Sequence, residues 1–129
     1  MSHEGKSETW KRGYEVRCRT LGKEYVEKSV GGADDFTRDW QDFLNEHAWG
    51  ASWARGGLEF KTRSMLNLAM LTALNRPHEF EIHLRGAINN GVSKDEVKEI
   101  LIQAAVYCGA PAALDSFKVA RRVFDELGI

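Results

Sequence analysis

The sequence predicts an all-α protein of about six helices joined by short loops. Apolar residues recur at helical spacing along most of the chain, whereas the alternation typical of strands is scarce. Both prolines, Pro77 and Pro111, stand where a helix can begin, because the first helical turn does not need the missing N–H. Ser93 and Glu96 form an S-x-x-E capping box, which marks a further helix start.

The first half of the chain is predicted to hold two helices and a connector. The first helix covers about residues 8–27, and the glycines at 31–32 then break the chain. The second helix begins after Asp34, a good N-cap residue, and ends near Gly50, which can adopt a left-handed conformation. Residues 51–57 form a short connector that ends in a second pair of glycines.

The second half is predicted to hold four helices, over about residues 58–75, 77–91, 93–108 and 111–127. Residues 65–74 are apolar on nearly all sides, and such a helix is buried on nearly all sides. In so small a protein, this pattern indicates a central helix or a helix that also packs against another subunit. The second alternative predicts a homo-oligomer.

Length and charge restrict the possible partners. A chain of 129 residues fits one domain, expected over residues 1–129, which can hold a core without disulfides. The net charge of −1 gives no basic surface for nucleic acid or for a membrane. The expected partner is a small molecule or a second copy of the chain.

The two cysteines, Cys18 and Cys108, form no C-x-x-C motif, so neither a dithiol redox site nor a cysteine-rich zinc site is predicted. Two lone cysteines suggest a reducing compartment. The N-terminal residues lack the apolar stretch of a signal peptide, and no apolar run has the length of a membrane span. The expected location is the cytoplasm.

Glu79 and His83 are the first candidates for chemistry. Their i, i+4 spacing places both on one helix face, where the carboxylate would orient the imidazole and favour its charged form. His83 lies about 60° around the helix from Phe80, at the edge of the apolar stripe, where a half-buried pocket would form. Two interpretations stay open, a proton donor near neutral pH or a weak surface pair.

Three arginines are candidates for binding carboxylates, because a guanidinium matches a carboxylate in a bidentate way. They are Arg63, Arg76 and Arg85. A solvated surface position is the alternative for each, and it is weakest for Arg63, at the start of the helix that looks most buried.

A compact aromatic group could wall a pocket, with structural packing as the equal alternative. It consists of His47, Trp49 and Trp53. The four histidines of the chain do not make a metal cluster, and no H-E-x-x-H motif occurs, so no metal site is predicted.

Five short motifs occur together along the chain. They are HAWG, KTRS, LAML-x-ALNR, E-x-x-x-H-x-RGA-x-NNGV and YCG-x-PAA. In combination they resemble the γ-carboxymuconolactone decarboxylase family, and the similarity runs from about residue 10 to the end. The resemblance implies the all-α fold of the alkylhydroperoxidase D-like proteins, usually assembled as a ring-shaped homohexamer.

The resemblance also implies an activity in protocatechuate breakdown, within the β-ketoadipate pathway. There, 4-carboxymuconolactone loses CO2 and gives β-ketoadipate enol-lactone without a cofactor. On this basis His83 is the expected proton donor and Glu79 the residue that orients it. The expected substrate contacts are Arg63, Arg76, Arg85, Trp49, Trp53 and His47.

Peroxidase relatives of this fold carry C-x-x-C-x-x-x-H before a similar helix–turn–helix. Counting back from His83 places Arg76 and Glu79 at the positions of those cysteines, and Ser64 falls roughly where their proton-relay glutamate stands. The redox residues are missing while the histidine is kept, which favours the decarboxylase. The alternatives are a thiol-dependent peroxidase, whose two cysteines would have to meet in space, and a family member that acts on another carboxylated lactone.

Overall fold

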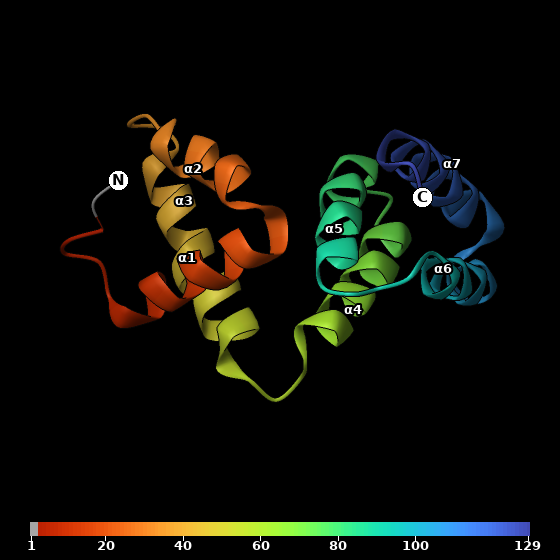
Figure 1. Cartoon of the computed structure of the whole chain (residues 1–129), viewed down its shortest axis with the longest axis horizontal. Helices are drawn as coiled ribbons and strands as arrows, with labels where there is room; N and C mark the ends of the chain where they lie inside the picture. The colour runs from red at the N-terminus through yellow and green to blue at the C-terminus, as the bar shows by residue number, and fades with distance from the viewer. Residues whose placement is uncertain (1–2) are drawn as a thin grey trace. The chain divides into compact units, whose positions relative to one another are not determined.

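The computed structural model describes residues 3–129, and all regular structure within them is helical (Figure 1). The chain divides into two compact units, Met1–Leu58 and Glu59–Ile129. The single domain expected over residues 1–129 stays a prediction. No helix of the described residues is both long enough and apolar enough to cross a membrane.

The first unit contains three α-helices, a π-helix and a short 3-10 helix. They are α1 (Glu8–Leu21), α2 (Lys23–Gly31), α3 (Arg38–Phe43), the π-helix η1 (Leu44–Ser52) and the 3-10 helix η2 (Trp53–Arg55). The single helix predicted between Asp34 and Gly50 is therefore the short α-helix α3, which continues directly into the π-helix η1. π-Helical segments are rare and occur frequently at functional sites.

Gly22 divides the single helix predicted over residues 8–27 into α1 and α2. Its φ of 100° lies in the region that favours glycine, and its N–H donates to the Cys18 carbonyl where α1 ends. The expectation of about six helices is therefore corrected, because residues 3–129 hold seven α-helices.

Gly50 does not end a helix in the left-handed conformation, as the sequence suggested, but lies buried inside η1. There it faces Gly13 of α1. A Cβ atom on Gly13 would overlap the backbone of Asn45 and Gly50, and one on Gly50 would overlap the Thr9 carbonyl. The two glycines therefore let α1 and η1 cross in direct backbone contact.

An arginine is buried inside the first unit. Arg17 is 5% exposed and donates from Nη1 to Gln41 Oε1 and to Asn45 Oδ1, both at 2.9 Å. Burial lowers the pKa of Arg17, because the charged form loses its water. Two neutral amides thus replace part of that water. The buried apolar side chains of this unit are Trp10, Val26, Trp49 and Trp53.

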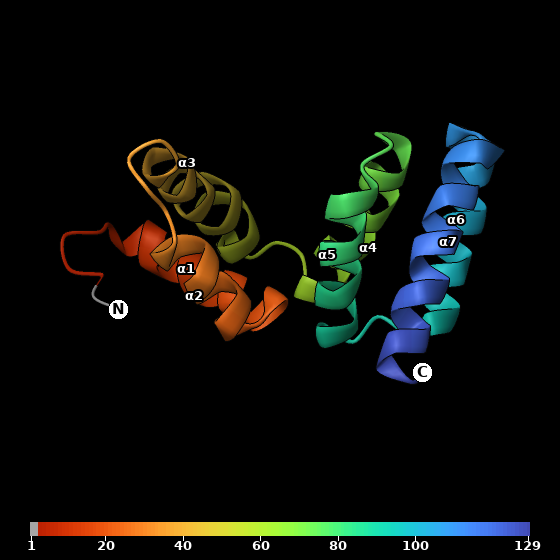
Figure 2. The ribbon, with the colours of Figure 1, turned by 90° about the horizontal axis from the view of Figure 1, so that it is seen from above.

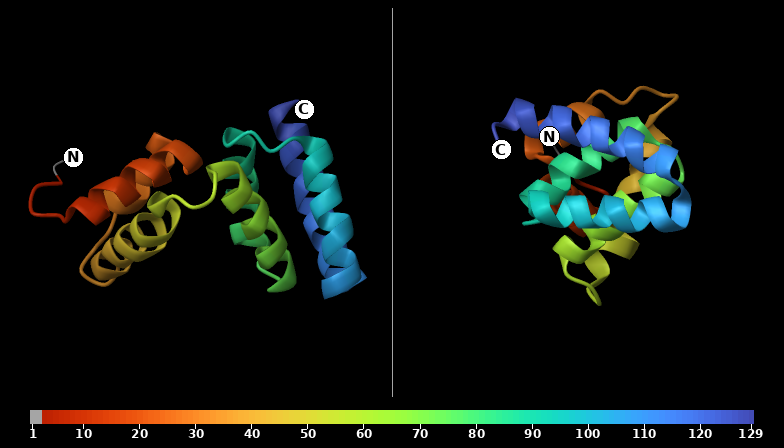
Figure 3. Two further views of the ribbon diagram at one scale, coloured as in Figure 1. Left: turned by 90° about the horizontal axis from the view of Figure 1, so that it is seen from below. Right: turned by 90° about the vertical axis from the view of Figure 1, so that its right-hand side faces the viewer.

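The second unit consists of four helices arranged as two neighbouring pairs (Figure 2). They are α4 (Phe60–Ala73), α5 (Pro77–Asn89), α6 (Lys94–Cys108) and α7 (Ala110–Leu127). Gly109 alone joins α6 to α7, which lie side by side (Figure 3). The packed core of the four helices contains Leu68, Phe80, Leu84, Ala87, Val92, Val97, Leu101, Ala120, Val123 and Phe124.

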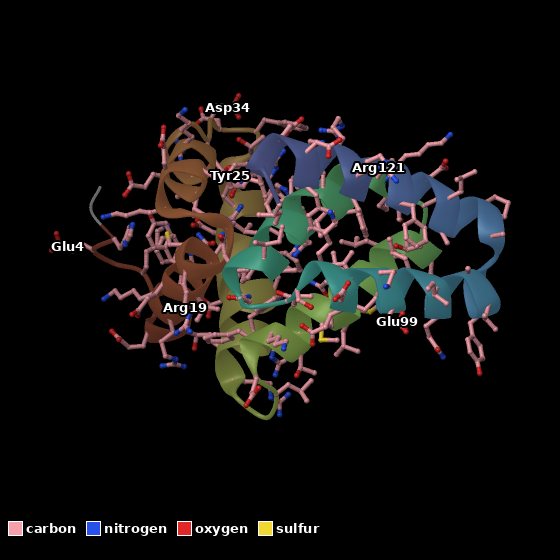
Figure 4. All side chains as sticks on the ribbon, turned by 45° about the vertical axis from the view of Figure 1, so that its right-hand side comes forward. Glu4, Arg19, Tyr25, Asp34, Glu99 and Arg121 are labelled. Carbon is pink, nitrogen blue, oxygen red and sulfur yellow. The ribbon has the colours of Figure 1, made fainter. Side chains whose placement is uncertain are left out.

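Two predicted features of this unit are confirmed. Pro77 stands in the first turn of α5. Ser93 and Glu96 form the capping box, since the Ser93 hydroxyl accepts from the Glu96 N–H and the Glu96 carboxylate accepts from the Ser93 N–H. Figure 4 draws the side chains on these helices, with Glu99 labelled on α6 and Arg121 on α7.

Within one chain the α4 helix is not buried on all sides, so it is not a central helix of the single chain, and its packing against another subunit stays a prediction. Leu66, Met70 and Leu74 are 47%, 51% and 62% exposed, and their spacing of four residues puts them on one face. Beside this face, an open groove of about 720 Å³ runs between α4 and α6. Its apolar lining includes Met65, Leu66, Ala69, Ile100, Ala104 and Tyr107.

Four charged side chains connect α5 to α7. Glu81 accepts from Arg122 at 2.6 Å and from Arg85 at 3.1 Å, and both arginines also pair with Glu126. The hydrogen bonds from Arg122 and Arg85 lower the pKa of Glu81 to about 2, and the one from Arg122 has the larger effect. The network is largely solvent-accessible, so its contribution to stability is screened.

Glu81→Gln is expected to reduce the free energy of unfolding by up to about 1 kcal/mol near neutral pH. The lowered pKa means that the carboxylate stabilises the folded state above its ordinary pKa of 4.5, and that this contribution is lost as the pH falls towards about 2. Urea unfolding of both proteins between pH 2 and 7 measures the difference. A difference that is the same at pH 7 and at pH 2, or that does not shrink in high salt, would contradict the assignment.

Candidate functional site

The contact between α4 and α5 contains two hydrogen bonds between polar side chains. Asn67 Nδ2 lies 3.4 Å from His83 Nδ1. Further along the same contact, Asn90 Nδ2 donates to Ser64 Oγ at 3.0 Å. The order of these pairs shows that the two helices run antiparallel, and the first pair places His83 in the helix–helix contact. We call this the α4–α5 site.

Burial dominates the electrostatics of His83. The side chain is half-buried, and loss of water around the ring lowers its pKa below the ordinary value of 6.5. The charge of Glu79 acts in the opposite direction and raises the pKa, as the sequence suggested, but its effect is the smaller one. Because Glu79 itself is exposed, water screens its charge. The unliganded ring is therefore mainly neutral at neutral pH.

The three predicted arginines lie in different environments. Arg63 is half-buried on α4, one helical turn before Asn67 and therefore on the same face. Arg76 is the exposed N-cap residue of α5, seven positions before His83, which again gives the same face. Arg85 lies two residues after His83, on another side of α5, and is paired with Glu81 and Glu126. By helical spacing, Arg63 and Arg76 therefore lie on the faces that carry Asn67 and His83, whereas Arg85 does not.

The predicted aromatic group belongs to the first unit. Trp49 of η1 and Trp53 of η2 are buried, with ring centroids 4.7 Å apart. The His47 side chain is exposed and lies 4.9 Å from the ring of Phe43. The two tryptophans therefore contribute to the packing of their own unit, and their role in walling a pocket stays a prediction.

Asn67 is the residue of this site that the motifs did not single out. A signal was present, because Asn67 is a polar residue inside an otherwise apolar stretch of α4, and a polar group in such a place needs a hydrogen-bonding partner. Ser64, noted only for its position relative to the peroxidases, is fully buried and accepts from Asn90. Sequence spacing alone does not show which residues of α5 these side chains meet.

The cysteines do not resemble a redox site. Neither Cys18 nor Cys108 forms a disulfide, and burial raises the pKa of Cys18, which disfavours the reactive thiolate. Among residues 3–129, no group of three or more His, Cys, Asp or Glu side chains is placed to hold a metal ion.

The fold defines the class of protein, an all-α protein in which the helical hairpin α4–α5 carries a half-buried histidine. The comparison with known families is specific. The profile of the carboxymuconolactone decarboxylase family matches residues 38–122, which includes η1, α4, α5, α6 and most of α7. The chain belongs to this family.

Two relatives with assigned activities are similar over most of the chain. The 4-carboxymuconolactone decarboxylase of Acinetobacter baylyi is 43% identical over 93% of this chain and 90% of its own length. The nitrosuccinic acid decarboxylase of Metarhizium robertsii is 41% identical over 89% of this chain and 80% of its own. An uncharacterised protein of Paracoccus denitrificans is 31% identical over 60% of each chain. Two decarboxylases with different substrates are therefore almost equally similar to this protein.

Glu79→Gln is expected to lower the pKa of His83 further, because it removes the charge that opposes the effect of burial. NMR titration of the His83 ring in wild type and variant measures both values, and the wild-type pKa should lie below 6.5. Glu99→Gln, an exposed change on α6, serves as the control and should leave the titration unchanged. A wild-type pKa above 6.5 would show that the ring is not desolvated as described.

Proposed function

We propose that the protein catalyses the decarboxylation of 4-carboxymuconolactone to β-ketoadipate enol-lactone in aromatic catabolism. The observation that carries the proposal is the 43% identity to a 4-carboxymuconolactone decarboxylase over nearly the whole of both chains. The half-buried His83 with a neighbouring carboxylate on the same helix face supports it, because such a group can move a proton.

The substrate explains why no cofactor is needed. When CO2 leaves the ring carbon, the electrons of the broken C–C bond move through the conjugated ring double bond onto the lactone oxygen. The ring is its own electron sink, and a dienolate results. The protein must hold the two carboxylates, stabilise the charge that develops on the lactone oxygen and return a proton to a ring carbon. Residues that donate hydrogen bonds or protons are sufficient for these tasks.

His83 is the proposed proton donor, with Glu79 as the residue that supports its charged form. The dianionic substrate brings negative charge to the ring, and such charge raises a histidine pKa. Substrate binding is therefore accompanied by proton uptake on His83. After decarboxylation the imidazolium gives a proton to the dienolate carbon.

Arg63 and Arg76 are the proposed carboxylate ligands, because both lie on the faces of α4 and α5 that meet at the α4–α5 site. Arg85 is a weaker candidate, since its guanidinium already has two carboxylate partners. Trp49, Trp53 and His47 stay proposed pocket-lining residues.

A second candidate function is the decarboxylation of nitrosuccinic acid. The relative with this name is only two percentage points less identical than the lactone decarboxylase. Both compounds present two carboxyl groups, so the same arginines could bind either. Release of CO2 from each compound, measured side by side with the purified protein, distinguishes the two functions. Absence of release from both would leave the family membership standing and remove the proposed function.

We also propose that the chain assembles as a homo-oligomer, a hexamer by the family resemblance. The support is the apolar α4 face together with the groove between α4 and α6, which a single chain leaves exposed. Contiguous apolar surface of this kind is typical of protein interfaces.

His83→Ala is expected to reduce kcat about 10²- to 10⁴-fold while the helical circular dichroism spectrum is kept. In the wild type, kcat/KM should fall as the pH rises through the pKa of free His83, which lies below 6.5, because the protonated ring is the donor. His78→Ala, an exposed change on the same helix, is the control and should keep full activity. A His83→Ala variant with nearly wild-type turnover would remove His83 from the mechanism.

Leu66→Glu is expected to convert the oligomer into smaller species, because a carboxylate would be placed in the apolar contact. Size-exclusion chromatography with light scattering measures the masses. Leu127→Glu, at an exposed position outside the groove, serves as the control and should leave the assembly intact. A monomeric wild-type protein would overturn the proposed assembly.

A further inference from the structure

The side chain of Asn67 has a specific relation to His83 that the proposed function does not yet explain. Asn67 is half-buried on α4, and its Nδ2 atom lies 3.4 Å from Nδ1 of the His83 ring. The distance is long for a hydrogen bond, but catalytic hydrogen bonds are often long in unliganded proteins and shorten when the substrate binds. The inference below rests on the proposed role of His83 as the proton donor.

With Asn67 Nδ2 towards the ring, the contact favours one tautomer of the neutral imidazole. An amide NH2 group can only donate, so Nδ1 must accept through its lone pair. A neutral imidazole has one N–H group, and with Nδ1 as the acceptor this group is Nε2–H. Burial keeps the unliganded ring mainly neutral, which agrees with this arrangement.

We propose that Asn67 is a positioning residue that holds His83 through Nδ1 in both protonation states, so that Nε2 carries the proton given to the substrate. Towards the neutral ring, Asn67 donates from Nδ2. Towards the protonated ring, which has an N–H group on Nδ1 as well, the amide turns about its last side-chain bond and accepts through Oδ1.

An amide is suited to this role because it contains a donor and an acceptor of nearly the same shape. A carboxylate at position 67 could only accept, and it would favour the charged ring even without substrate. An aliphatic side chain could do neither, and the ring would lose its partner on α4. Asparagine therefore allows the ring to be neutral at rest and charged in the complex.

The protons balance over one reaction cycle. Substrate binding adds one solvent proton to Nδ1 of the ring, which then carries two N–H groups. After the C–C bond breaks and CO2 leaves, the Nε2 proton moves to the dienolate carbon. The ring keeps its proton on Nδ1, and this N–H group donates a hydrogen bond to Asn67 Oδ1. Loss of that proton to solvent and uptake of another on Nε2 restore the resting state.

The first experiment needs no substrate. In ¹⁵N-labelled protein above the pKa of His83, the ring nitrogens should show the Nε2–H tautomer, with Nδ1 unprotonated; the signals are assigned by comparison with His83→Gln. In Asn67→Leu the tautomer preference should be reduced. A ring with its proton on Nδ1 in the wild type would overturn the proposal.

The second experiment measures pH profiles of kcat/KM with 4-carboxymuconolactone. Asn67→Asp should shift the alkaline limb upwards by about one pH unit or more, because a carboxylate next to the ring stabilises the imidazolium. Asn67→Leu should lower kcat about ten-fold or more, with a smaller change in KM, because the ring is less well oriented. A merely structural role would lower activity without moving the limb.

Asn89→Asp, an exposed amide-to-carboxylate change on α5, is the matched control and should leave the limb in place. An unshifted limb in a folded Asn67→Asp protein would overturn the proposal. The two hypotheses fail in different ways, because an inactive wild type with the Nε2–H tautomer removes the proposed function only. An active wild type with the Nδ1–H tautomer removes the role of Asn67 only.

Discussion

The packing of α4 against α5 is the contact on which the candidate site depends. Buried apolar side chains such as Leu68, Phe80 and Leu84 hold the two helices together, and each contributes roughly 1.5–3 kcal/mol through the loss of water contact. The two polar pairs of this contact contribute about 1 kcal/mol each. The apolar core therefore sets the distance between the helices, and the positions of Asn67 and His83 follow from it.

The behaviour of His83 shows how position in the fold changes a chemical group. On an isolated helix, Glu79 would be its main influence, and the ring would be charged more readily. Within the packed pair of helices, loss of solvent has the larger effect, so the pKa of the ring lies below its ordinary value. Under the proposed function, such a site would couple proton uptake to the binding of an anionic substrate.

The features that could be predicted from the sequence are those whose cause is local. Pro77, the Ser93–Glu96 capping box and the apolar periodicity of the last four helices each act within a few residues, and the structure agrees with them. The partner of His83 could not be predicted, because Asn67 lies sixteen positions away and meets it only after the helices pack. The pairing of Arg85 with Glu126 could not be predicted for the same reason, since Glu126 comes from α7.

The glycine contact between α1 and η1 has a consequence for the interpretation of saturation mutagenesis. Gly13 and Gly50 tolerate no side chain, because the opposing backbone occupies the space. In a deep mutational scan selected for growth, both positions would be as depleted of variants as a catalytic residue. Abundance measured in parallel separates the two cases, since loss at these glycines reflects the amount of folded protein, whereas loss at a chemical residue leaves that amount unchanged.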